Sequence, residues 1–523
     1  MNNQKILKTD VLVLGTGIAG CVAALCLAEN KKIEVLLVTK DKDIRRSSTL
    51  RAQGGIIARG QNDSAEKLKK DILLAGDGLC NEKAVDILSK EGPELVERIL
   101  IGKVGVEFNK SKGKLDYTKE AAHSEDRILY KNDHTGEEIE NKLTRALKRN
   151  KNIKILTDHT LVDLLTMSHH AVDRRKVYQN KKCVGGYLLN NQNGLVKTVF
   201  AKKTILATGG IGQVYLRSTN PEIATGDGLA TAFRAGAEII NAEYVQFHPT
   251  SLFHRDVDNF LISESLRGEG AKLRNEKGKL FMKKYDKRGS LAPRDIVARG
   301  IYEEILSSKK DFVYLDLASY LDRKYIGKRF PLIYRTCLKY GIDITREMIP
   351  VAPTAHYFCG GIKIDEFGKS SLENLYAIGE VSCTGVHGAN RLASTSLLEG
   401  LVFANRCAEN ILGKISDSRL VQKRDIKPWI YTGDQTVDLA LIKQDWMSLK
   451  SIMWNYVGIV RTEERLERAV LDLNYLKHRI EKFYCNVCLD KDLLELRNGI
   501  QTALIIAEAA KQNRKSRGCH YRS

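Results

Sequence analysis

The sequence has 523 residues, of which 43% are hydrophobic and 28% are charged, with 41 Gly but only 8 Pro. This composition is typical of a folded protein of about three domains, and it argues against a disordered chain or a small disulfide-stapled scaffold. Lys and Arg outnumber Asp and Glu by 84 to 64, a net charge of +20, but the basic residues are scattered and no aromatic-interleaved basic motif occurs, so we expect no nucleic-acid partner.

The first predicted element lies in an uncharged stretch at residues 11–28, which is long enough to resemble a membrane span. Glycines interrupt it between the apolar residues 11–14 and the Ala- and Leu-rich residues 21–28, in the motif Gly15-Thr16-Gly17-Ile18-Ala19-Gly20. A strand, a tight turn and a helix explain this order better, so we expect no membrane span. The apolar residues 33–39 add a second strand and complete a β-α-β unit of about thirty residues, the length of a dinucleotide-binding unit.

The glycine motif is typical of phosphate binding in this setting. It follows a strand and opens a helix, so its backbone amides and the helix dipole can hold a pyrophosphate. The acidic residue that usually ends the second strand and binds the ribose is missing, because these positions are Thr39 and Lys40. We therefore expect the nucleotide to be held differently at that strand end.

Later segments outline the domain organisation. Residues 182–210 predict a hairpin that turns at Asn193-Gly194, followed by a further strand at residues 204–207 that ends in a glycine-rich turn. Residues 241–355 contain mixed short elements before glycine-rich sequence returns at 360–400, which is typical of a domain inserted between two halves of another. Beyond about residue 427 glycine is rare and apolar residues recur at helical spacing.

These patterns predict an α/β fold with a Rossmann-like nucleotide-binding domain, an inserted α+β domain and a C-terminal helical domain. The expected boundaries are 1–241 with 357–417 for the first domain, 242–356 for the second and 428–523 for the third. Further glycine-rich elements at residues 46–55 and 374–380 suit a backbone pressed against a flat ligand, so we expect an extended cofactor.

Seven motifs stand in a fixed order along the chain. They are Gly15 to Gly20, Ala52-Gln53-Gly54-Gly55, Gln246-Phe247-His248-Pro249-Thr250, Arg267-Gly268-Glu269-Gly270, Ala292-Pro293-Arg294-Asp295, His356-Tyr357 and the block from His387 to Leu398. Together they closely resemble the fumarate reductase, succinate dehydrogenase and L-aspartate oxidase flavoproteins over nearly the whole chain. The resemblance implies FAD as the cofactor, an FAD-binding first domain and a capping function for the inserted domain.

The residue at position 48 distinguishes branches of this superfamily. The membrane-complex dehydrogenases carry a His in an R-S-H-T motif that bonds covalently to the flavin, whereas this sequence has Arg46-Ser47-Ser48-Thr49. The resemblance therefore implies non-covalent FAD. Residues 52–55, 119–124 and 454–461 are similar to the L-aspartate oxidase branch.

Two alternatives stay open at this point. A soluble fumarate reductase or a succinate dehydrogenase flavoprotein subunit shares nearly every motif, although the missing flavin-linking His weighs against the second. A non-catalytic FAD-binding assembly protein would keep the fold without the activity. The joint presence of His248, Arg294, His356 and Arg391 weighs against that class.

The resemblance assigns a set of residues to the flavin. Within this set the first glycine motif would hold the diphosphate, Glu380 would accept from ribityl or ribose hydroxyls and Ser396 would bond a ring edge. The full set is Gly15, Thr16, Gly17, Ile18, Ala19, Gly20, Lys40, Ser48, Thr49, Leu50, Arg51, Ala52, Gln53, Gly54, Gly55, Asp227, Glu380, Ser396 and Leu397. Thr395 stands where the family commonly has Asn.

The resemblance also assigns residues to a four-carbon dicarboxylate substrate. Arg391, His248 and His356 would bind its carboxylates, and an arginine can do so bidentately. Glu120 would pair with an ammonium group beside C2, which is the group that separates L-aspartate from succinate.

Arg294 would be the proton donor or acceptor at the reacting carbons. Because the pKa of arginine exceeds about 12, we expect the proton to be relayed, through Glu264 or Glu269. The implied reaction is oxidation of L-aspartate to iminosuccinate by hydride transfer from C2 to flavin N5, with oxygen or fumarate as the electron acceptor. Iminosuccinate would feed quinolinate and NAD biosynthesis, which implies functional coupling to quinolinate synthase.

Cysteine usage indicates the compartment. The 11 Cys are irregularly spaced and several, such as Cys21 and Cys26, lie in apolar runs, so we expect buried thiols in a reducing compartment, the cytoplasm. Cys485 and Cys488 resemble a redox or metal pair, but no second pair accompanies them, so we expect no metal site.

Several remaining features have a plain structural interpretation. The basic residues 511–517 predict a solvated end, and residues 517–521 match a C-terminal family motif to which the sequence gives no role. Histidines without motif support are interpreted as ordinary surface or core imidazoles, namely His123, His159, His169, His170, His254 and His478.

Overall fold

A mixed sheet forms the centre of the computed structural model, which describes residues 6–256, 259–431 and 433–523. Its strands are β1 (Ile6–Leu14), β2 (Val35–Val38), β8 (Ile153–Leu156), β9 (His159–Thr166), β10 (Cys183–Asn190), β11 (Val196–Leu206) and β18 (Leu375–Ala377). Their order is β8-β2-β1-β11-β10-β9, with β18 also pairing with β11. The pairs of β1, β2, β8, β11 and β18 are parallel, whereas β10 is antiparallel to both of its neighbours. The predicted α/β core is therefore confirmed.

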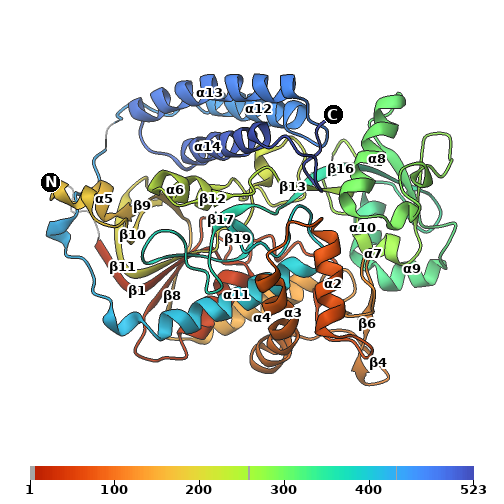
Figure 1. The fold of residues 1–523 in the computed structure, drawn as a ribbon, viewed down its shortest axis with the longest axis horizontal. Coiled ribbons are helices and arrows are strands. Elements are labelled where there is room, and N and C mark those ends of the chain that lie inside the picture. The colour runs from red at the N-terminus through yellow and green to blue at the C-terminus, as the bar shows by residue number, and fades with distance from the viewer. Residues whose placement is uncertain (1–5, 257–258, 432) are drawn as a thin grey trace.

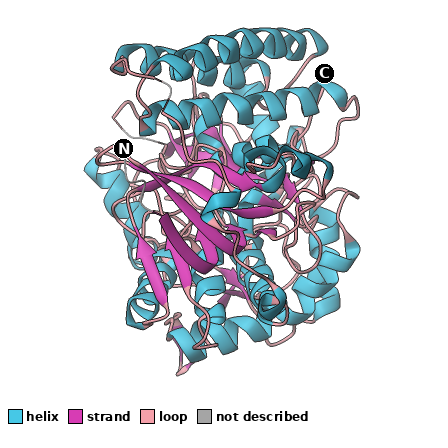
Figure 2. Ribbon diagram, turned by 90° about the vertical axis from the view of Figure 1, so that its left-hand side faces the viewer, coloured by secondary structure: helices cyan, strands magenta, loops and turns pink. Residues whose placement is uncertain are grey.

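Alternating side chains of β1 anchor two helical layers. Val11 and Val13 join the core formed with one layer, and Leu12 and Leu14 join the core formed with the other. The helices of the first layer are α1 (Ile18–Leu27), α2 (Ala65–Ala75), α3 (Glu82–Leu95), α4 (Thr135–Arg149) and α11 (Thr395–Leu412). On the opposite face lie α6 (Asp227–Ala235) and the C-terminal helices, so that Figure 2 shows the strands between two sets of helices.

The hairpin predicted at residues 182–210 is present. β10 and β11 pair in antiparallel fashion across Asn193-Gly194, where Gly194 has φ +68°. The further strand predicted at residues 204–207 is wrong as a separate element, because Thr204–Leu206 is the end of β11 itself. β11 pairs in parallel with β1 from Thr198 to Leu206, and along its other edge the antiparallel neighbour β10 is followed by the parallel strand β18, a change of partner that the sequence pattern does not reveal.

The inserted region has its own sheet and core. Its strands run in the order β13-β16-β15-β14, with β13 (Val245–Leu252), β14 (Lys272–Arg274), β15 (Val313–Asp316) and β16 (Ile349–Phe358). Its helices are α7 (Glu264–Gly268), α8 (Arg294–Ser307), α9 (Arg323–Arg329) and α10 (Pro331–Lys339), which lie at the right of Figure 1. A separate apolar cluster fills the space between them. β16 continues to Phe358, two residues beyond the expected boundary at 356.

The predicted C-terminal helical region consists of α12 (Leu439–Tyr456), α13 (Glu463–Asn486) and α14 (Lys491–Gln512), at the top of Figure 1. They share a core with α6 and the central sheet. The chain after α14 returns to the protein rather than into solvent. Cys519 and His520 are buried, the Cys519 amide donates to the Ala389 carbonyl at 2.9 Å, and His520 Nδ1 lies 2.7 Å from Arg461 Nη1. The family motif at residues 517–521 therefore attaches the helical domain to the loop that precedes α11.

The remaining α-helix and strands are short. They are α5 (Met167–His170), β3 (Ile56–Ile57), β4 (Lys110–Ser111), β5 (Lys114–Leu115), β6 (Tyr117–Thr118), β7 (Ile128–Leu129), β12 (Ile239–Ile240), β17 (Gly361–Lys363) and β19 (Ser382–Cys383). In the described ranges, no helix has both the length and the apolar character that a bilayer crossing requires. All 11 cysteines are free thiols, with Cys21 and Cys26 buried as expected and with Cys485 and Cys488 exposed.

Candidate active site

One continuous cavity joins the central sheet to the inserted domain. We call its first part the glycine end; the predicted residues that line it are Gly15, Thr16, Gly17, Ile18, Ala19, Lys40, Ser48, Thr49, Arg51, Ala52, Gln53, Gly54, Gly55, Asp227, Glu380, Ser396 and Leu397. We call the second part the arginine end; the predicted residues that line it are Glu120, His248, Glu264, Arg294, His356 and Arg391. The structure thus brings nearly all of the predicted site residues to one cavity.

Gly20 and Leu50 are the predicted cofactor residues that lie outside the cavity lining of the described chain. A Cβ atom on Gly20 would lie 2.0 Å from the Gly15 carbonyl oxygen, so this glycine permits α1 to pack closely on the turn that precedes it. The Leu50 amide donates to Ser47 Oγ at 3.2 Å and shapes the neighbouring loop.

The start of α1 forms the floor of the glycine end. Gly15 has φ +113° and Gly17 is the N-cap, which supplies no side-chain oxygen to the first turn. Thr49 Oγ1 accepts from the Ile18 amide at 3.0 Å, which ties residues 46–55 to this helix start. Residues 15–19 line the cavity at this helix start, where the helix dipole favours a phosphate group.

Lys40 occupies the strand end where a ribose-binding acid was missing from the sequence. Its Nζ lies 2.6 Å from Asp227 and 2.7 Å from Glu495, and it donates to Thr225 Oγ1 at 2.7 Å. Although burial opposes its charge, these carboxylates hold the pKa of Lys40 above its usual value. Acidic groups are therefore present at this strand end, but α6 and α14 supply them, and Glu495 carries no motif that could have revealed it.

Two further acceptors, Glu380 and Gln53, line the cavity. Glu380 accepts from the Phe358 amide at 3.0 Å, and burial raises the pKa of its carboxyl to about 7. Gln53 is 5% exposed, and its Oε1 has no hydrogen-bond partner among the described residues. Both atoms suit ligand hydroxyl or amide donors. With the open helix start, they make the glycine end fit an extended dinucleotide such as FAD.

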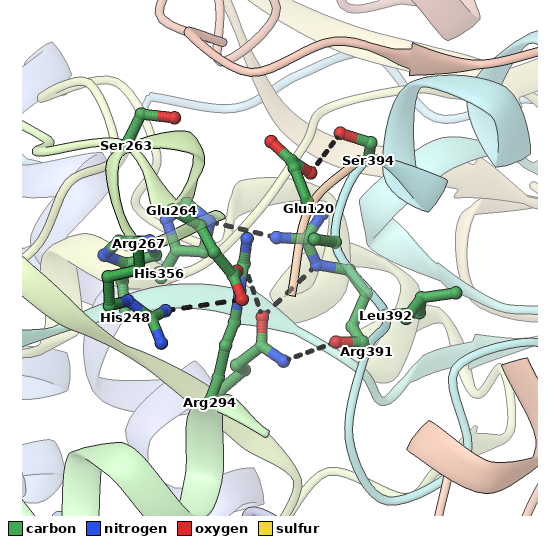
Figure 3. Close-up of polar contacts among 12 residues, drawn as sticks. Glu120, His248, Ser263, Glu264, Arg267, Arg294, His356, Arg391, Leu392 and Ser394 are labelled. Atoms are coloured by element: carbon green, nitrogen blue, oxygen red, sulfur yellow. Dashed lines mark hydrogen bonds and ion pairs between the residues drawn. The ribbon is translucent and has the colours of Figure 1, made fainter. Parts of the chain in front are cut away.

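The arginine end is a cluster of buried ionisable side chains from both domains (Figure 3). Arg294 begins α8, and its guanidinium forms an ion pair with Glu264 of α7. Glu264 also lies 3.3 Å from Arg267 Nη2, and these two cations hold its pKa below the usual value despite burial. Arg391 precedes α11 and donates to Ser396 Oγ at 2.7 Å. Ser396, a predicted flavin-binding residue, therefore contacts Arg391, a predicted substrate-binding residue.

Gln246 connects the two arginines and was absent from the predicted residue set. Its Oε1 accepts from Arg294 Nη1 at 3.0 Å and from Arg391 Nε at 3.3 Å. Its Nε2 donates to the Arg391 carbonyl at 2.9 Å and to Asn390 Oδ1 at 2.7 Å. The fully buried amide thereby couples the inserted domain to the loop before α11. Its place in the motif that contains His248 was the available signal.

The two histidines of the arginine end are neutral donors or acceptors rather than cations. Burial, followed by the charges of nearby arginines, lowers the pKa of His248 and of His356 well below the usual value. His356 Nε2 lies 2.9 Å from Arg391 Nη2, so it accepts from the guanidinium while Nδ1 lies 2.7 Å from Thr219 Oγ1. His248 Nδ1 lies 2.9 Å from the Thr250 carbonyl oxygen and 3.2 Å from the Thr250 amide nitrogen; in the tautomer in which Nδ1 accepts from that amide, Nε2 carries the proton and can donate to a ligand.

Glu120 reaches the arginine end from the loop that follows β6. It is 3% exposed and accepts from Ser394 Oγ at 2.6 Å and from Ser265 Oγ at 3.1 Å. Burial and the nearby Glu264 raise its pKa. Figure 3 shows its carboxylate pointing toward Ser394, above the arginine cluster. Glu120 is therefore a buried carboxylate of the cavity and not a solvated loop residue.

The structure separates the two carboxylates considered for a proton relay. Glu264 contacts Arg294 directly. Glu269 instead lies 3.4 Å from Arg329 and accepts from Tyr325 Oη at 3.0 Å, so its expected place beside Arg294 is wrong. Among the histidines interpreted as ordinary, His159 lines the cavity with its ring 2.7 Å from Lys197 Nζ, and His123 is buried. Within the described ranges no cluster of His, Cys, Asp and Glu has a metal-binding arrangement.

Comparison with known families places the chain among flavoproteins. Residues 10–397 match the FAD binding domain family, and residues 446–523 match the fumarate reductase flavoprotein C-terminal family. A mutant of the E. coli quinol fumarate reductase FrdA has a similar structure, with a TM-score of 0.89 and 28% identity over 99% of this chain and 92% of that chain. Mycobacterium smegmatis Sdh1 in complex with UQ1 follows with a TM-score of 0.81 and 29% identity over 99% and 89%.

Curated relatives narrow this assignment. The L-aspartate oxidase of Yersinia pestis is 42% identical over 98% of this chain and 95% of that protein. The L-aspartate oxidase of Halobacterium salinarum is also 42% identical, over 98% and 96%. The identity thus extends over the FAD-binding, inserted and C-terminal helical regions alike. The chain belongs to the L-aspartate oxidase family of FAD-binding flavoproteins.

Proposed function

We propose that this protein oxidises L-aspartate to iminosuccinate, with non-covalently bound FAD. The observation that carries the proposal is the buried cluster of arginines, neutral histidines and carboxylates that opens onto the glycine end of the same cavity. When bound, FAD would accept a hydride from C2 of the substrate and would pass the electrons to oxygen or fumarate. The protein's task is to align the substrate with the flavin and to handle charge and protons.

The arginine end suits a substrate with two carboxylates. Arg391 and Arg294 each carry a planar guanidinium that can donate two hydrogen bonds to one carboxylate. In the tautomer in which Nδ1 accepts from the Thr250 amide, the Nε2–H of His248 can donate a neutral hydrogen bond to a carboxylate, and His356 holds Arg391 through its Nε2. Because Gln246 fixes the two guanidiniums relative to each other, their spacing can select the length of the dicarboxylate.

Arg294 would exchange with the substrate the proton that accompanies hydride transfer, which L-aspartate loses from its ammonium nitrogen as the imine forms and which fumarate gains at carbon. Its contact with Glu264 supports a relay, because a guanidinium is already protonated and can take up a further proton only when it passes one of its own to the Glu264 carboxylate. Glu120 would bind the substrate ammonium through a charge-assisted bond. The two serine hydroxyls that donate to Glu120 would orient it toward that group.

A comparison of two substrates tests this proposal. Under anaerobic conditions, L-aspartate should bleach the absorbance of the bound flavin rapidly, whereas succinate should bleach it slowly. If succinate bleaches the flavin faster than L-aspartate does, the protein is a dicarboxylate dehydrogenase. If neither substrate bleaches it, the protein is not an oxidase of this class.

Non-covalent FAD is supported by Ser48, which lines the cavity where covalent members carry the linking His. Acid precipitation should leave a colourless pellet and a yellow supernatant. Flavin that stays with the denatured protein would contradict this part of the proposal.

Fumarate reduction is the second candidate activity, and the structural similarity to the E. coli and Mycobacterium smegmatis flavoproteins favours it. Fumarate lacks the ammonium but presents the same two carboxylates to the arginine end, so it can act as the alternative electron acceptor. A reduced viologen dye measures this reaction directly.

We further propose that iminosuccinate passes to quinolinate formation and so to NAD synthesis, through functional coupling to quinolinate synthase. We also propose that the enzyme acts in the cytoplasm, where its 11 free thiols would stay reduced.

A further inference from the structure

The loop from Glu120 to Ser124 is held in a compact turn outside the sheet. The His123 amide donates to the Glu120 carbonyl at 3.2 Å, and Ala122 between them has φ +67°, a conformation that non-glycine residues rarely adopt. Surrounding contacts must therefore stabilise this turn.

The His123 side chain makes one such contact on each ring nitrogen. Nε2 lies 3.1 Å from the Ala393 carbonyl oxygen, and Nδ1 lies 3.2 Å from Arg127 Nη1. Because a guanidinium only donates, Nδ1 accepts, and the proton resides on Nε2, which donates to Ala393. Burial and the charge of Arg127 lower the pKa of His123 to about 4, which agrees with this neutral tautomer.

Arg127 is itself fixed. Its side chain is fully buried in ion pairs with Asp63, at 2.8 Å, and with Asp71 of α2. Asp71 also accepts from the Ser124 amide and from Ser124 Oγ, both at 2.8 Å. Ser124, at the end of the turn, and Arg127, which contacts His123 Nδ1, are therefore both attached to α2 through Asp71.

The second ring contact of His123 is to Ala393, which directly precedes the serine that donates to Glu120. Ser394 directly follows Ala393, has φ +58° and donates to Glu120 Oε2 at 2.6 Å. A ring of contacts thus runs from Glu120 through His123 and Ala393 to Ser394 and back to Glu120. Gly54 borders this ring, because a Cβ atom there would lie 2.5 Å from Glu120 Oε1.

We infer that His123 is a positioning residue that fixes the Glu120 carboxylate relative to Ser394, and so sets the preference for a substrate that carries an ammonium group. This inference rests on the proposed function and deepens it. His123 lies outside the cavity lining of the described residues, so it acts through Glu120 and not on the substrate. The sequence placed it among ordinary imidazoles, since only the fold brings it to Ala393.

Three variants of the full-length, flavin-loaded protein test the inference. His123→Ala removes both ring contacts. We expect the KM for L-aspartate to rise about tenfold, which corresponds to the net contribution of about one hydrogen bond. We expect kcat/KM for fumarate reduction to change less than about twofold, because fumarate has no ammonium to pair. His123→Gln keeps an N–H that can reach the Ala393 carbonyl and should restore most of the aspartate KM, whereas the shorter His123→Asn should not.

His170→Ala is the matched control. His170 is a partly buried ring on α5 that bonds the Thr166 backbone outside the cavity lining, so neither substrate should be affected. Hydrogen exchange at the amides of residues 120–124 gives a readout independent of turnover. Exchange there should accelerate in the Ala variant and return toward the wild-type rate in the Gln variant.

Equal losses on L-aspartate and fumarate, or an unchanged aspartate KM, would overturn the inference while leaving the proposed function intact. A wild-type protein that does not oxidise L-aspartate would overturn both. If His123→Ala loses its flavin, the comparison of the Gln and Asn variants decides, and equal aspartate KM values for these two overturn the positioning role.

Discussion

The two ends of the cavity differ in the kind of protein groups that line them. The glycine end is made largely of backbone and small side chains, and much of it comes from short continuous motifs at residues 15–19 and 48–55. The arginine end is made of buried charged side chains that the sheet order and the inserted domain bring together from positions 120 to 391. We expect changes at the glycine end to alter cofactor affinity and changes at the arginine end to alter turnover, and the predictions below test that division.

Arg294→Leu should have the largest effect. We expect L-aspartate turnover to fall by at least about 10³-fold, because the proton exchange assigned to Arg294 and one carboxylate contact are lost together. FAD content, measured from the ratio of flavin to protein absorbance, should stay at the wild-type level. Turnover near the wild-type rate would remove Arg294 from the chemistry, and loss of FAD would show that the two ends are not separable.

Arg391→Leu should weaken dicarboxylate binding more than it slows the chemical step. Removing one partner of a buried charge pair costs about 3–5 kcal/mol, so a bound carboxylate that faced Arg391 loses affinity by that order. KM should rise for L-aspartate and for fumarate alike, since both place a carboxylate there. A lower kcat with an unchanged KM for both would assign Arg391 to the reaction itself.

The contrast between the ends also explains what the sequence could predict. The glycine motif fixes the local backbone, so the cavity-lining residues Gly15 to Ala19 follow from adjacent sequence alone. The roles of Gln246 and Glu495 could not be assigned in this way, because Gln246 bridges Arg294 and Arg391 and Glu495 pairs with Lys40, and only the tertiary fold brings these distant residues together. The error at Glu269 has the same origin, since spacing from Glu264 does not indicate which carboxylate turns toward Arg294.

Glu380, at the glycine end, should make the stability of the flavin-free protein depend on pH. Its folded-state pKa of about 7 lies above its ordinary value of 4.5, so the flavin-free folded protein binds more protons than the unfolded chain between these pH values. Stability of the flavin-free protein should therefore fall as pH rises through this window, by about 3 kcal/mol in total. Thermal unfolding at several pH values measures this, and Glu380→Gln should flatten the profile. A profile that stays equally steep in the variant would assign the pH dependence to other groups.

Glu120→Gln should give the smallest but most selective effect. It removes the charge that would pair with the substrate ammonium yet keeps an acceptor for Ser265 and Ser394, so we expect a loss of about 1.5–3 kcal/mol, roughly 10- to 100-fold, in kcat/KM for L-aspartate. Fumarate reduction should be largely spared. Equal losses on both substrates would mean that Glu120 supports general binding.

The raised pKa of Glu120 adds a second, independent signature. Burial and Glu264 favour its protonated form, whereas binding of the ammonium requires the carboxylate. In the wild type, kcat/KM for L-aspartate should therefore fall as pH falls through a pKa above the usual value for glutamate, and this acid limb should be missing from fumarate reduction and from Glu120→Gln. An identical acid limb in all three profiles would trace it to another group, and the preference for an amino acid would then have to arise from the arginine spacing instead.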